Sequence, residues 1–236
     1  ASMIDKKIHY CWFGGKKLPN DVKKCIKSWK KKCPDYEIIR WDENNFDINC
    51  CEFVKDAYKN KAWAFVSDYA RLKIIYENGG IYLDTDVELI RSLDDLLINK
   101  CYLPQQQDGN YIATGLGFGA IKESYVIKEM LDIYNSVIFD NGKRNEFACP
   151  KLNTLVIKKY GSYENDKISV LNKDITIYPP KYFDPIAPGK TENLMCKDTY
   201  SIHHYSASWT KLGNRLKRKF VNFIGQDKIN TIKKGD

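Results

Sequence analysis

Acidic and apolar residues alternate in the segment 81–89, which reads IYLDTDVEL. This alternation predicts a β-strand, on which Asp84 and Asp86 share one face with their Cα atoms roughly 6–7 Å apart. Two carboxylates at that separation repel each other unless a positive charge lies between them. A hard divalent cation with oxygen ligands supplies that charge and keeps coordination positions free for phosphate oxygens. The spacing therefore predicts a metal and diphosphate site, although an outward, solvated strand face is the open alternative.

The segment before this strand strengthens the prediction. Residues 62–78 form a helical pattern, and Gly79-Gly80 ends it with the residue type that tolerates a left-handed cap. Asp68 and Arg71 are three residues apart and lie on one side of that helix, as they would in an ordinary surface ion pair. A surface pair does not explain the whole ordered run, which continues from this helix through Gly79-Gly80 to Tyr82, Asp84 and Asp86.

That run resembles the sugar-nucleotide-binding core of the Asp-x-Asp glycosyltransferases of family 32. The family includes yeast outer-chain mannosyltransferases and many bacterial capsule and polysaccharide enzymes, and the same core occurs in the large clostridial glucosylating toxins. The resemblance covers about residues 7–90, with a weaker similarity near 178–209. It implies an α/β protein with the GT-A fold, in which helices flank a mixed central sheet, and a nucleotide-sugar donor.

The resemblance also implies roles for single residues. Asp86 matches the direct metal ligand of the family, and Asp84 matches a second carboxylate beside it. The residues that match donor-contacting positions are Trp12, Asp68, Arg71, Tyr82 and Asp84. Among them, Trp12 is expected to stack on the nucleotide base, with a buried core aromatic as the alternative.

A second part of the expected site lies near the end of the chain, in the segment 201–209 (SIHHYSASW). It is similar to the family's closing segment, in which a metal ligand and a Trp fold over the donor. A neutral imidazole can complete a metal site begun by two carboxylates. Strand alternation turns His203 and His204 to opposite faces, and we expect His204 to be the ligand. Trp209 is expected to cap the diphosphate through its indole N–H, or to be buried.

The remaining elements alternate along the chain, which favours an α/β layered architecture. The predicted strands, besides 81–89, cover residues 7–13, 36–41, 111–114, 116–120, 175–178 and 200–204. The predicted helices cover 20–33, 51–59, 62–78, 124–138 and 152–159. The glycines of 115–120 match the spacing of a dinucleotide-binding fingerprint but lack its strand-to-helix context, so we do not expect NAD binding. We expect instead that they let the backbone approach the donor sugar closely.

The charge is unevenly distributed. The net charge of +8 divides into +9 over residues 6–32, +6 over 211–236 and −7 over the rest, which argues against a uniform nucleic-acid binder. The N-terminal lysines are either a solvated helix face or an approach to phosphate or an anionic membrane. We expect one catalytic domain over 1–210 and a basic, helical extension over 211–236. Residues 211–224 have the pattern of an amphipathic helix on an anionic bilayer, with packing on the domain as the alternative.

Cellular context follows from what the sequence lacks. No leader and no apolar run long enough to span a membrane is apparent, and the eight cysteines include no C-x-x-C pair, so zinc is not expected. We therefore expect a cytoplasmic protein with reduced thiols, peripheral at the inner face of the membrane if the C-terminal helix binds there.

Together with the family resemblance, these residues predict a metal-dependent glycosyltransferase that uses Mn²⁺ or Mg²⁺. The resemblance further implies that it retains the anomeric configuration and moves a hexose, with a UDP-sugar favoured as donor, to a hydroxyl of a glycan or lipid-linked saccharide in bacterial capsule or surface polysaccharide synthesis. The catalytic residues are expected to be Arg71, Asp84 and Asp86, with Arg71 and the metal stabilising the leaving diphosphate. A metal-dependent phosphodiesterase or nuclease and a non-catalytic carbohydrate-binding protein are the alternatives.

Overall fold

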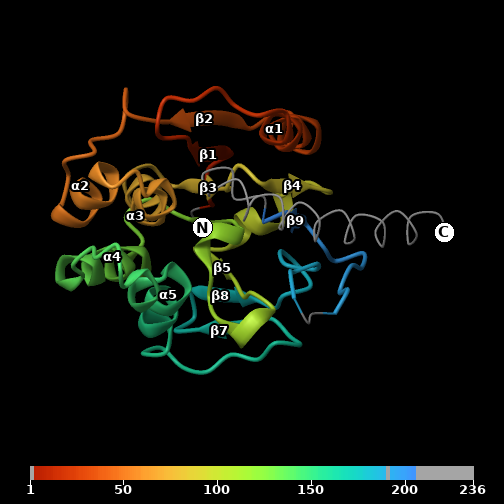
Figure 1. Cartoon of the computed structure of the whole chain (residues 1–236). Helices are drawn as coiled ribbons and strands as arrows, with labels where there is room; N and C mark the ends of the chain where they lie inside the picture. The colour runs from red at the N-terminus through yellow and green to blue at the C-terminus, as the bar shows by residue number, and fades with distance from the viewer. Residues whose placement is uncertain (1–2, 190–191, 206–236) are drawn as a thin grey trace.

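The computed structural model describes residues 3–189 and 192–205. Helices in this part of the chain are α1 (Asn20–Lys32), α2 (Glu52–Lys59), α3 (Trp63–Asn78), α4 (Tyr125–Asp132) and α5 (Cys149–Ile157). The strands are β1 (Lys7–Cys11), β2 (Glu37–Trp41), β3 (Gly80–Tyr82), β4 (Val87–Leu89), β5 (Cys101–Pro104), β6 (Phe118–Ala120), β7 (Ser169–Leu171), β8 (Ile175–Tyr178) and β9 (Ser201–His203). Figure 1 shows their arrangement.

The central sheet is mixed, as the sequence predicts. Its seven strands lie in the order β2-β1-β3-β6-β5-β8-β7. The pairs β1–β2, β1–β3 and β5–β8 are parallel, and β3–β6, β5–β6 and β7–β8 are antiparallel. Strands β4 and β9 form a separate two-stranded antiparallel sheet. The carboxyl ends of β1 and β3 consequently lie side by side, where the chain of β3 leaves the central sheet.

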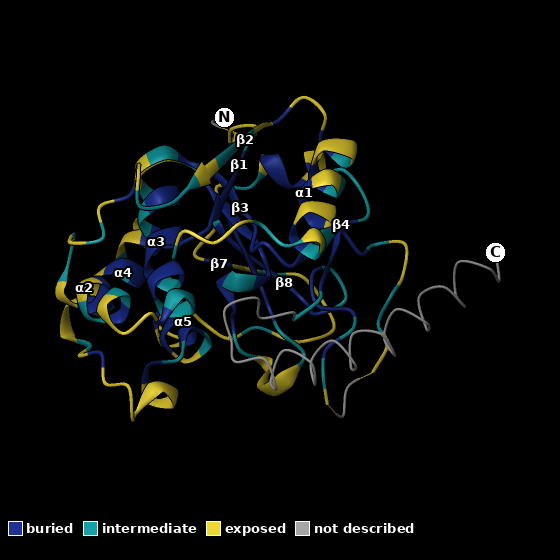
Figure 2. Ribbon diagram, turned by 45° about the horizontal axis from the view of Figure 1, so that its top comes forward, coloured by how far each residue is buried: buried dark blue, intermediate teal, exposed yellow. Residues whose placement is uncertain are grey.

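Helices lie on both faces of the central sheet, and its inner strands are buried on both sides (Figures 1 and 2). One hydrophobic cluster joins α2, α3, α4 and α5 to side chains such as Tyr82 and Leu103. The other joins α1 to the neighbouring positions Ile81 and Tyr102, whose side chains point to the opposite face. Alternate residues of a strand therefore pack into two separate hydrophobic clusters, one on each face of the sheet.

Helix α3 feeds directly into the sheet through two glycines. Gly79 has a φ of 69°, and a Cβ there would lie 2.9 Å from the backbone nitrogen of Lys122. Gly80 follows with a φ of 111° and opens β3. Both values are in the left-handed region that favours glycine, which confirms the predicted helix end. The sharp turn fixes the distance between the end of α3 and the segment that carries Asp84 and Asp86.

The prediction of one continuous strand over 81–89 is wrong. Strand β3 ends at Tyr82, and a turn follows in which the amide of Val87 donates to the carbonyl of Asp84 at 3.1 Å. The chain then resumes as β4, which pairs with β9 rather than with the central sheet. Alternation of apolar residues is the same in one strand and in two short strands joined by a turn, so the pattern did not reveal the break. Asp84 and Asp86 therefore lie on a turn and not on one strand face.

Other boundaries also differ. Residues 111–114 form no strand but a single bridge between Gln105 and Ile112, and a short 3-10 helix covers Thr114–Leu116. Strand β6 starts at Phe118, two residues later than expected. The predicted helix over 124–138 ends at Asp132 and continues as a 3-10 turn, and α5 starts at Cys149, earlier than expected. Strands β5 and β7 were not predicted.

Two expectations concern residues outside the described part of the chain. Trp209 and the basic segment 211–236, with its amphipathic stretch 211–224, belong to the range 206–236. The proposed domain limit at residue 210 therefore stays a prediction. Among the described residues, no helix has both the length and the apolar content needed to cross a bilayer.

Candidate active site

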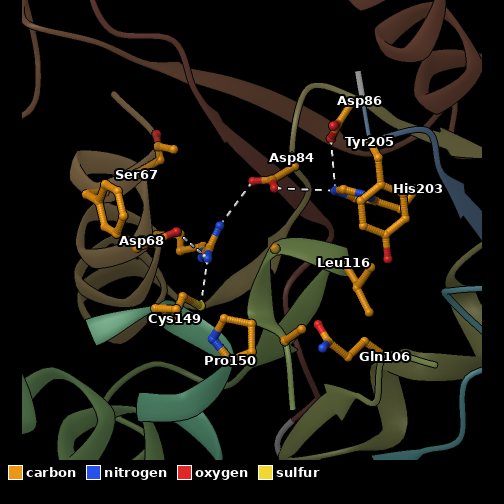
Figure 3. A pocket seen from close by; sticks show the side chains of 16 residues that line it. Ser67, Asp68, Asp84, Asp86, Gln106, Leu116, Cys149, Pro150, His203 and Tyr205 are labelled. Atoms are coloured by element: carbon orange, nitrogen blue, oxygen red, sulfur yellow. Dashed lines mark hydrogen bonds and ion pairs between the residues drawn. The ribbon is translucent and has the colours of Figure 1, made fainter. Parts of the chain in front are cut away.

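A cavity of about 310 Å³ opens at the edge of the central sheet, where six segments meet. Its walls come from one face of α3, the turn after β3, Gln106 after β5, the loop 113–116, the start of α5 and the end of β9. Figure 3 shows Asp84 in the middle of this cavity, with interactions towards both of its ends. One end is a group of two carboxylates and an imidazole, and the other is a buried guanidinium.

The first group is Asp84, Asp86 and His203. One ligand atom from each lies within 4.8 Å of the others, and the residues are 7–9% exposed. His203 Nε2 lies 3.1 Å from Asp86 Oδ1 and 3.7 Å from Asp84 Oδ2. Among the described residues, Asp86 Oδ1 has no hydrogen bond of acceptable geometry despite its burial. A buried carboxylate oxygen without such a bond, beside a second carboxylate and an imidazole, fits a divalent cation with O and N ligands.

The electrostatics of the group agree with this assignment. Burial lowers the pKa of His203, but the carboxylates of Asp86 and Asp84 outweigh it and raise that pKa to about 10. Burial raises the pKa of Asp86, yet His203 lowers it to a net value below its usual range. In the metal-free protein the imidazolium therefore supplies the positive charge that two adjacent carboxylates require.

The structure places His203, and not the expected His204, beside the carboxylates. In the β4–β9 ladder Val87 is opposite His203, which directs the side chain of His203 towards the turn before β4. The next residue points the other way, and Nε2 of His204 lies 2.9 Å from Oε1 of Glu88. The alternation that separates the two histidines was predicted, and the expected ligand His204 lies on the side away from the two carboxylates.

The second group centres on Arg71, which is 4% exposed. Its guanidinium donates to Asp68 at 2.7 Å, to Asp84 at 3.2 Å and to the hydroxyl of Thr114 at 3.0 Å. It also donates to the sulfur of Cys149 at 2.9 Å. Burial raises the pKa of Asp68 to about 6, against the lowering effect of Arg71. The predicted pair of Asp68 and Arg71 is thus part of the cavity wall and not a solvated surface pair.

Small residues let the loop 113–116 approach these charges. A Cβ on Gly115 would lie 2.9 Å from Oδ2 of Asp84 and 3.2 Å from Nη1 of Arg71. A larger residue would therefore displace either the carboxylate or the guanidinium. The expectation that a glycine here permits a close backbone approach agrees with this geometry, although the approach is to the charged side chains of the cavity.

The other predicted donor contacts have different surroundings. Tyr82 is 1% exposed, and its hydroxyl donates to Oδ1 of Asp84 at 3.0 Å, so it orients the carboxylate from behind. Trp12 is 5% exposed, belongs to the cluster around α1, and donates its indole N–H to the carbonyl of Lys16 at 2.6 Å. The described residues lining the cavity include neither of them. The stacking role of Trp12 stays a prediction, as does the capping role of Trp209.

Sequence reasoning missed a set of residues that hold the cavity together. Asp184 is fully buried and accepts hydrogen bonds from the amide of Gln107 at 2.9 Å and the hydroxyl of Tyr205 at 2.7 Å. The ring of Tyr205 meets that of His203 edge to face, with centroids 4.2 Å apart. Tyr205 has a φ of 51°, so its backbone adopts a left-handed conformation that few residues with a Cβ adopt. A lone buried Asp in a loop gave no sequence signal for this contact.

Cys149 is the other missed residue. It opens α5, lines the cavity and is 5% exposed. Its thiol donates to Oδ1 of Asn153 at 3.0 Å and lies 3.3 Å from the hydroxyl of Thr114. Burial raises the pKa of this thiol, although Arg71 opposes the effect. Cys149 and Asn153 therefore connect α5 to the loop that carries Gly115.

Comparison with known proteins shows which proteins this chain resembles. Residues 19–103 match the family described as "Glycosyltransferase sugar-binding region containing DXD motif". Over 233 residues the chain is 28% identical to "Uncharacterized glycosyltransferase L373" of Acanthamoeba polyphaga mimivirus, a match that covers 88% of this chain and 84% of that protein. It is 25% identical over 160 residues to the human "Lactosylceramide 4-alpha-galactosyltransferase", covering 58% of this chain and 40% of the enzyme.

Two further matches define the extent of the similarity. The chain is 29% identical over 113 residues to "Subversion of eukaryotic traffic protein A" of Legionella pneumophila, but this match spans 17% of that protein. Among solved structures, "PaToxG Glycosyltransferase" superposes with a TM-score of 0.51 at 17% identity, covering 67% of this chain and 69% of that one. The mixed sheet flanked by helices is thus the GT-A fold, as predicted. These matches also favour the transferase over a phosphodiesterase or a non-catalytic carbohydrate-binding protein.

Proposed function

We propose that this chain, a glycosyltransferase with a DXD sugar-binding region, transfers a hexose from a nucleotide sugar to a hydroxyl of a glycan or lipid-linked saccharide. The observation that carries the proposal is the cavity itself. It joins a three-residue group suited to a divalent cation to a buried arginine, and Asp84 contacts both. A diphosphate and a sugar are the two parts of a donor that such a pair of subsites would hold.

Asp84, Asp86 and His203 are the residues that would hold the cation, with Mn²⁺ or Mg²⁺ as candidates. When bound, the cation would supply positive charge to the leaving diphosphate. The imidazole of His203 must lose its proton to act as a ligand, and the hydroxyl of Tyr82 holds Asp84 in place through a 3.0 Å hydrogen bond. His203 thus replaces His204 in the proposed ligand set.

Arg71 is proposed as the fixed positive charge at the sugar end of the cavity. Its hydrogen bonds to Asp68, Asp84 and Thr114 hold the guanidinium in one orientation before the donor arrives. A preorganised charge of this kind stabilises developing negative charge without reorganisation during the reaction. The apolar side chains of Phe65, Leu116 and Pro150 line the same cavity and reduce the access of water.

We propose that the transfer retains the anomeric configuration, with the acceptor proton passing to the leaving diphosphate. Support comes from the carboxylates that line the cavity in the described part of the chain. Asp68 and Asp84 are both paired with Arg71, and Asp86 would be a ligand of the cation. Each carboxylate therefore has a positive partner, and the departing diphosphate remains as the base that takes the proton of the acceptor hydroxyl.

The donor and acceptor are proposed on narrower grounds. UDP is favoured over GDP, and a role in bacterial capsule or surface polysaccharide synthesis is proposed, on the family resemblance alone. A lipid-linked acceptor agrees with the name of the human relative, a lactosylceramide 4-alpha-galactosyltransferase. A cytoplasmic location, peripheral to the inner membrane face, belongs to the same proposal.

A donor-hydrolysis panel of UDP- and GDP-sugars, with and without Mn²⁺ or Mg²⁺, tests the function. We expect metal-dependent hydrolysis of a UDP-hexose and its loss by orders of magnitude in Asp86→Asn, which keeps the shape of the side chain and removes its charge. Glu88→Gln is the matched control, because Glu88 follows in the same segment but faces His204. Equal activity of both variants, with the metal still required, would remove Asp86 from the site.

A further inference from the structure

The outer face of α1 carries a row of lysines that form no ion pair with any residue that the structure describes. The helix has six lysines and no arginine: Lys23, Lys24, Lys27, Lys30, Lys31 and Lys32. All are exposed except the half-buried Lys32, and Lys16 and Lys17 just before the helix are exposed as well. The apolar residues of α1 face inward, and Figure 2 shows the exposed residues along its outer side.

Lysines on other helices of this protein form ion pairs with carboxylates of the same helix. Lys55 of α2 pairs with Glu52, Lys73 of α3 with Glu77, and Lys128 of α4 with Asp132. Within the described residues, no carboxylate lies within 4 Å of any α1 lysine. In these three helices a carboxylate lies three or four residues from the lysine and neutralises its charge. Helix α1 has no such ion pair among the described residues.

The α1 lysines also repel one another. Lys27 is three or four residues from Lys23, Lys24, Lys30 and Lys31, so four like-charge pairs converge on it. Like charges at these spacings destabilise a helix. The helix dipole favours the lysines of the last turn but not Lys23 and Lys24 near the start. A purely solvated face gains nothing from this arrangement, whereas an anionic partner would relieve the repulsion.

We propose that the lysine face of α1, with Lys16 and Lys17, docks on an anionic lipid bilayer. The face is a row along one convex helix, which suits a planar surface. Lysine ammonium groups act as point charges towards a diffuse field, whereas the bidentate recognition of individual phosphates favours arginine. Residues outside the two basic ends sum to −7, which opposes a nucleic acid that would wrap around the protein.

The contact would act close to the candidate active site. The indole of Trp29 donates to the carbonyl of Val87 at 2.7 Å, and the amide of Leu89 donates to the hydroxyl of Ser28 at 3.0 Å. The inner face of α1 thus holds β4, which starts directly after Asp86. A bilayer on the outer face would fix the orientation of this region towards an acceptor carried in the membrane. The surface proposal itself does not depend on the identity of the donor.

Cosedimentation of the full chain with vesicles tests the proposal. The probe is phosphatidylcholine containing about one third phosphatidylglycerol, compared with pure phosphatidylcholine. We expect binding to the anionic vesicles at low ionic strength and release by high salt. Each basic residue contributes about a fivefold change, so Lys23→Glu/Lys27→Glu/Lys31→Glu should lower the partition coefficient by at least about 100-fold. Lys59→Glu/Lys158→Glu/Lys159→Glu is the control with the same change in net charge, and it should bind within a few-fold of the unaltered chain.

Lys27→Glu alone gives a second readout. It converts four repulsive pairs into attractive ones, so we expect its melting temperature to rise by about 2–4 °C while vesicle binding falls. A variant that is folded and more stable, yet binds less, cannot be explained by damage to the fold.

Two results would overturn the proposal. One is vesicle binding by the triple variant that equals binding by the unaltered chain. If ending the chain at residue 210 then abolishes binding, the binding depends on the residues after 210 and not on the lysines of α1. The other is preferential binding of a nucleic-acid probe over anionic vesicles at the same salt concentration.

Discussion

Protonation of His203 should control how tightly the protein binds its metal. In the metal-free site His203 lies 3.1 Å from Asp86 and 3.7 Å from Asp84, and these carboxylates raise its pKa to about 10 in spite of its burial. Only the neutral imidazole can be a ligand, so metal binding must release one proton. At pH 7.5 the neutral form is about 1 part in 300, which costs the metal roughly 3 kcal/mol of apparent affinity.

The expected consequence is a steep pH dependence. Between about pH 6.5 and pH 8.5 the apparent affinity for Mn²⁺ alone should rise nearly tenfold per pH unit, because the pKa of His203 lies above this range. Calorimetry in buffers of different ionisation enthalpy measures both the affinity and the number of protons released. We expect close to one proton per metal bound, without any need for the sugar donor.

Two variants separate this histidine from its neighbour. His203→Asn should bind Mn²⁺ with little pH dependence over the same range. His204→Asn should keep the dependence, because its Nε2 faces Glu88 at 2.9 Å. A flat affinity profile with no proton release in the unaltered protein would refute the reasoning, and a flat profile in His204→Asn alone would return the ligand role to His204.

The same pKa sets the stability of the metal-free protein. The folded pKa of His203 is raised above the unfolded value of about 6.5, so its contribution is complete below that value and is lost as pH rises towards 10. The pKa of Asp86 is lowered, so its contribution is present above its unfolded pKa and is lost as pH falls. The two shifts describe one ion pair, and urea denaturation without metal should show a single stability maximum between these limits.

Three further substitutions probe the surroundings of the site. Arg71→Met leaves two buried carboxylates without their partner, so we expect a loss of about 3–5 kcal/mol in the free energy of unfolding at neutral pH, measured by urea denaturation, and a smaller loss at pH 5. Trp12→Ala should weaken UDP binding tenfold or more, as about 1–3 kcal/mol of stacking predicts; unchanged affinity of a folded variant in calorimetry would leave Trp12 a core residue. Asp184→Ala removes the acceptor of two buried hydrogen bonds, so we expect about 1–3 kcal/mol less stability and weaker Mn²⁺ binding, because Tyr205 no longer holds its ring against His203; unchanged Mn²⁺ affinity would show that Asp184 serves stability only.

The sequence predicted which residues meet in the cavity better than it predicted the shape of the cavity. Asp68, Arg71, Asp84 and Asp86 were found because they belong to one short, ordered run, and local spacing is visible in a sequence. All four line the cavity. Their mutual contacts depend on the helix end at Gly79, and glycine at this position is a sequence signal for the end of a helix.

What the sequence could not show depends on pairing between distant segments. The choice of His203 over His204 follows from the register that places Val87 opposite His203, 116 positions later in the chain. Alternation within 201–204 separates the two side chains but does not say which face meets β4. A shift of one residue in that ladder would exchange them. Strand β7 was missed because it is three residues long and carries too little pattern to stand out from a loop.

The error about the segment 81–89 has a physical lesson for metal sites. On one straight strand, Asp84 and Asp86 would face the same side, roughly two residues of rise apart, with backbone neighbours on both flanks. The turn instead lets the chain leave the central sheet and start a second one, so a strand from the far end of the chain can pair beside it. This pairing brings the imidazole of His203 within 4 Å of both carboxylates. The break in the strand therefore lets a third candidate ligand from a distant segment join the two acids.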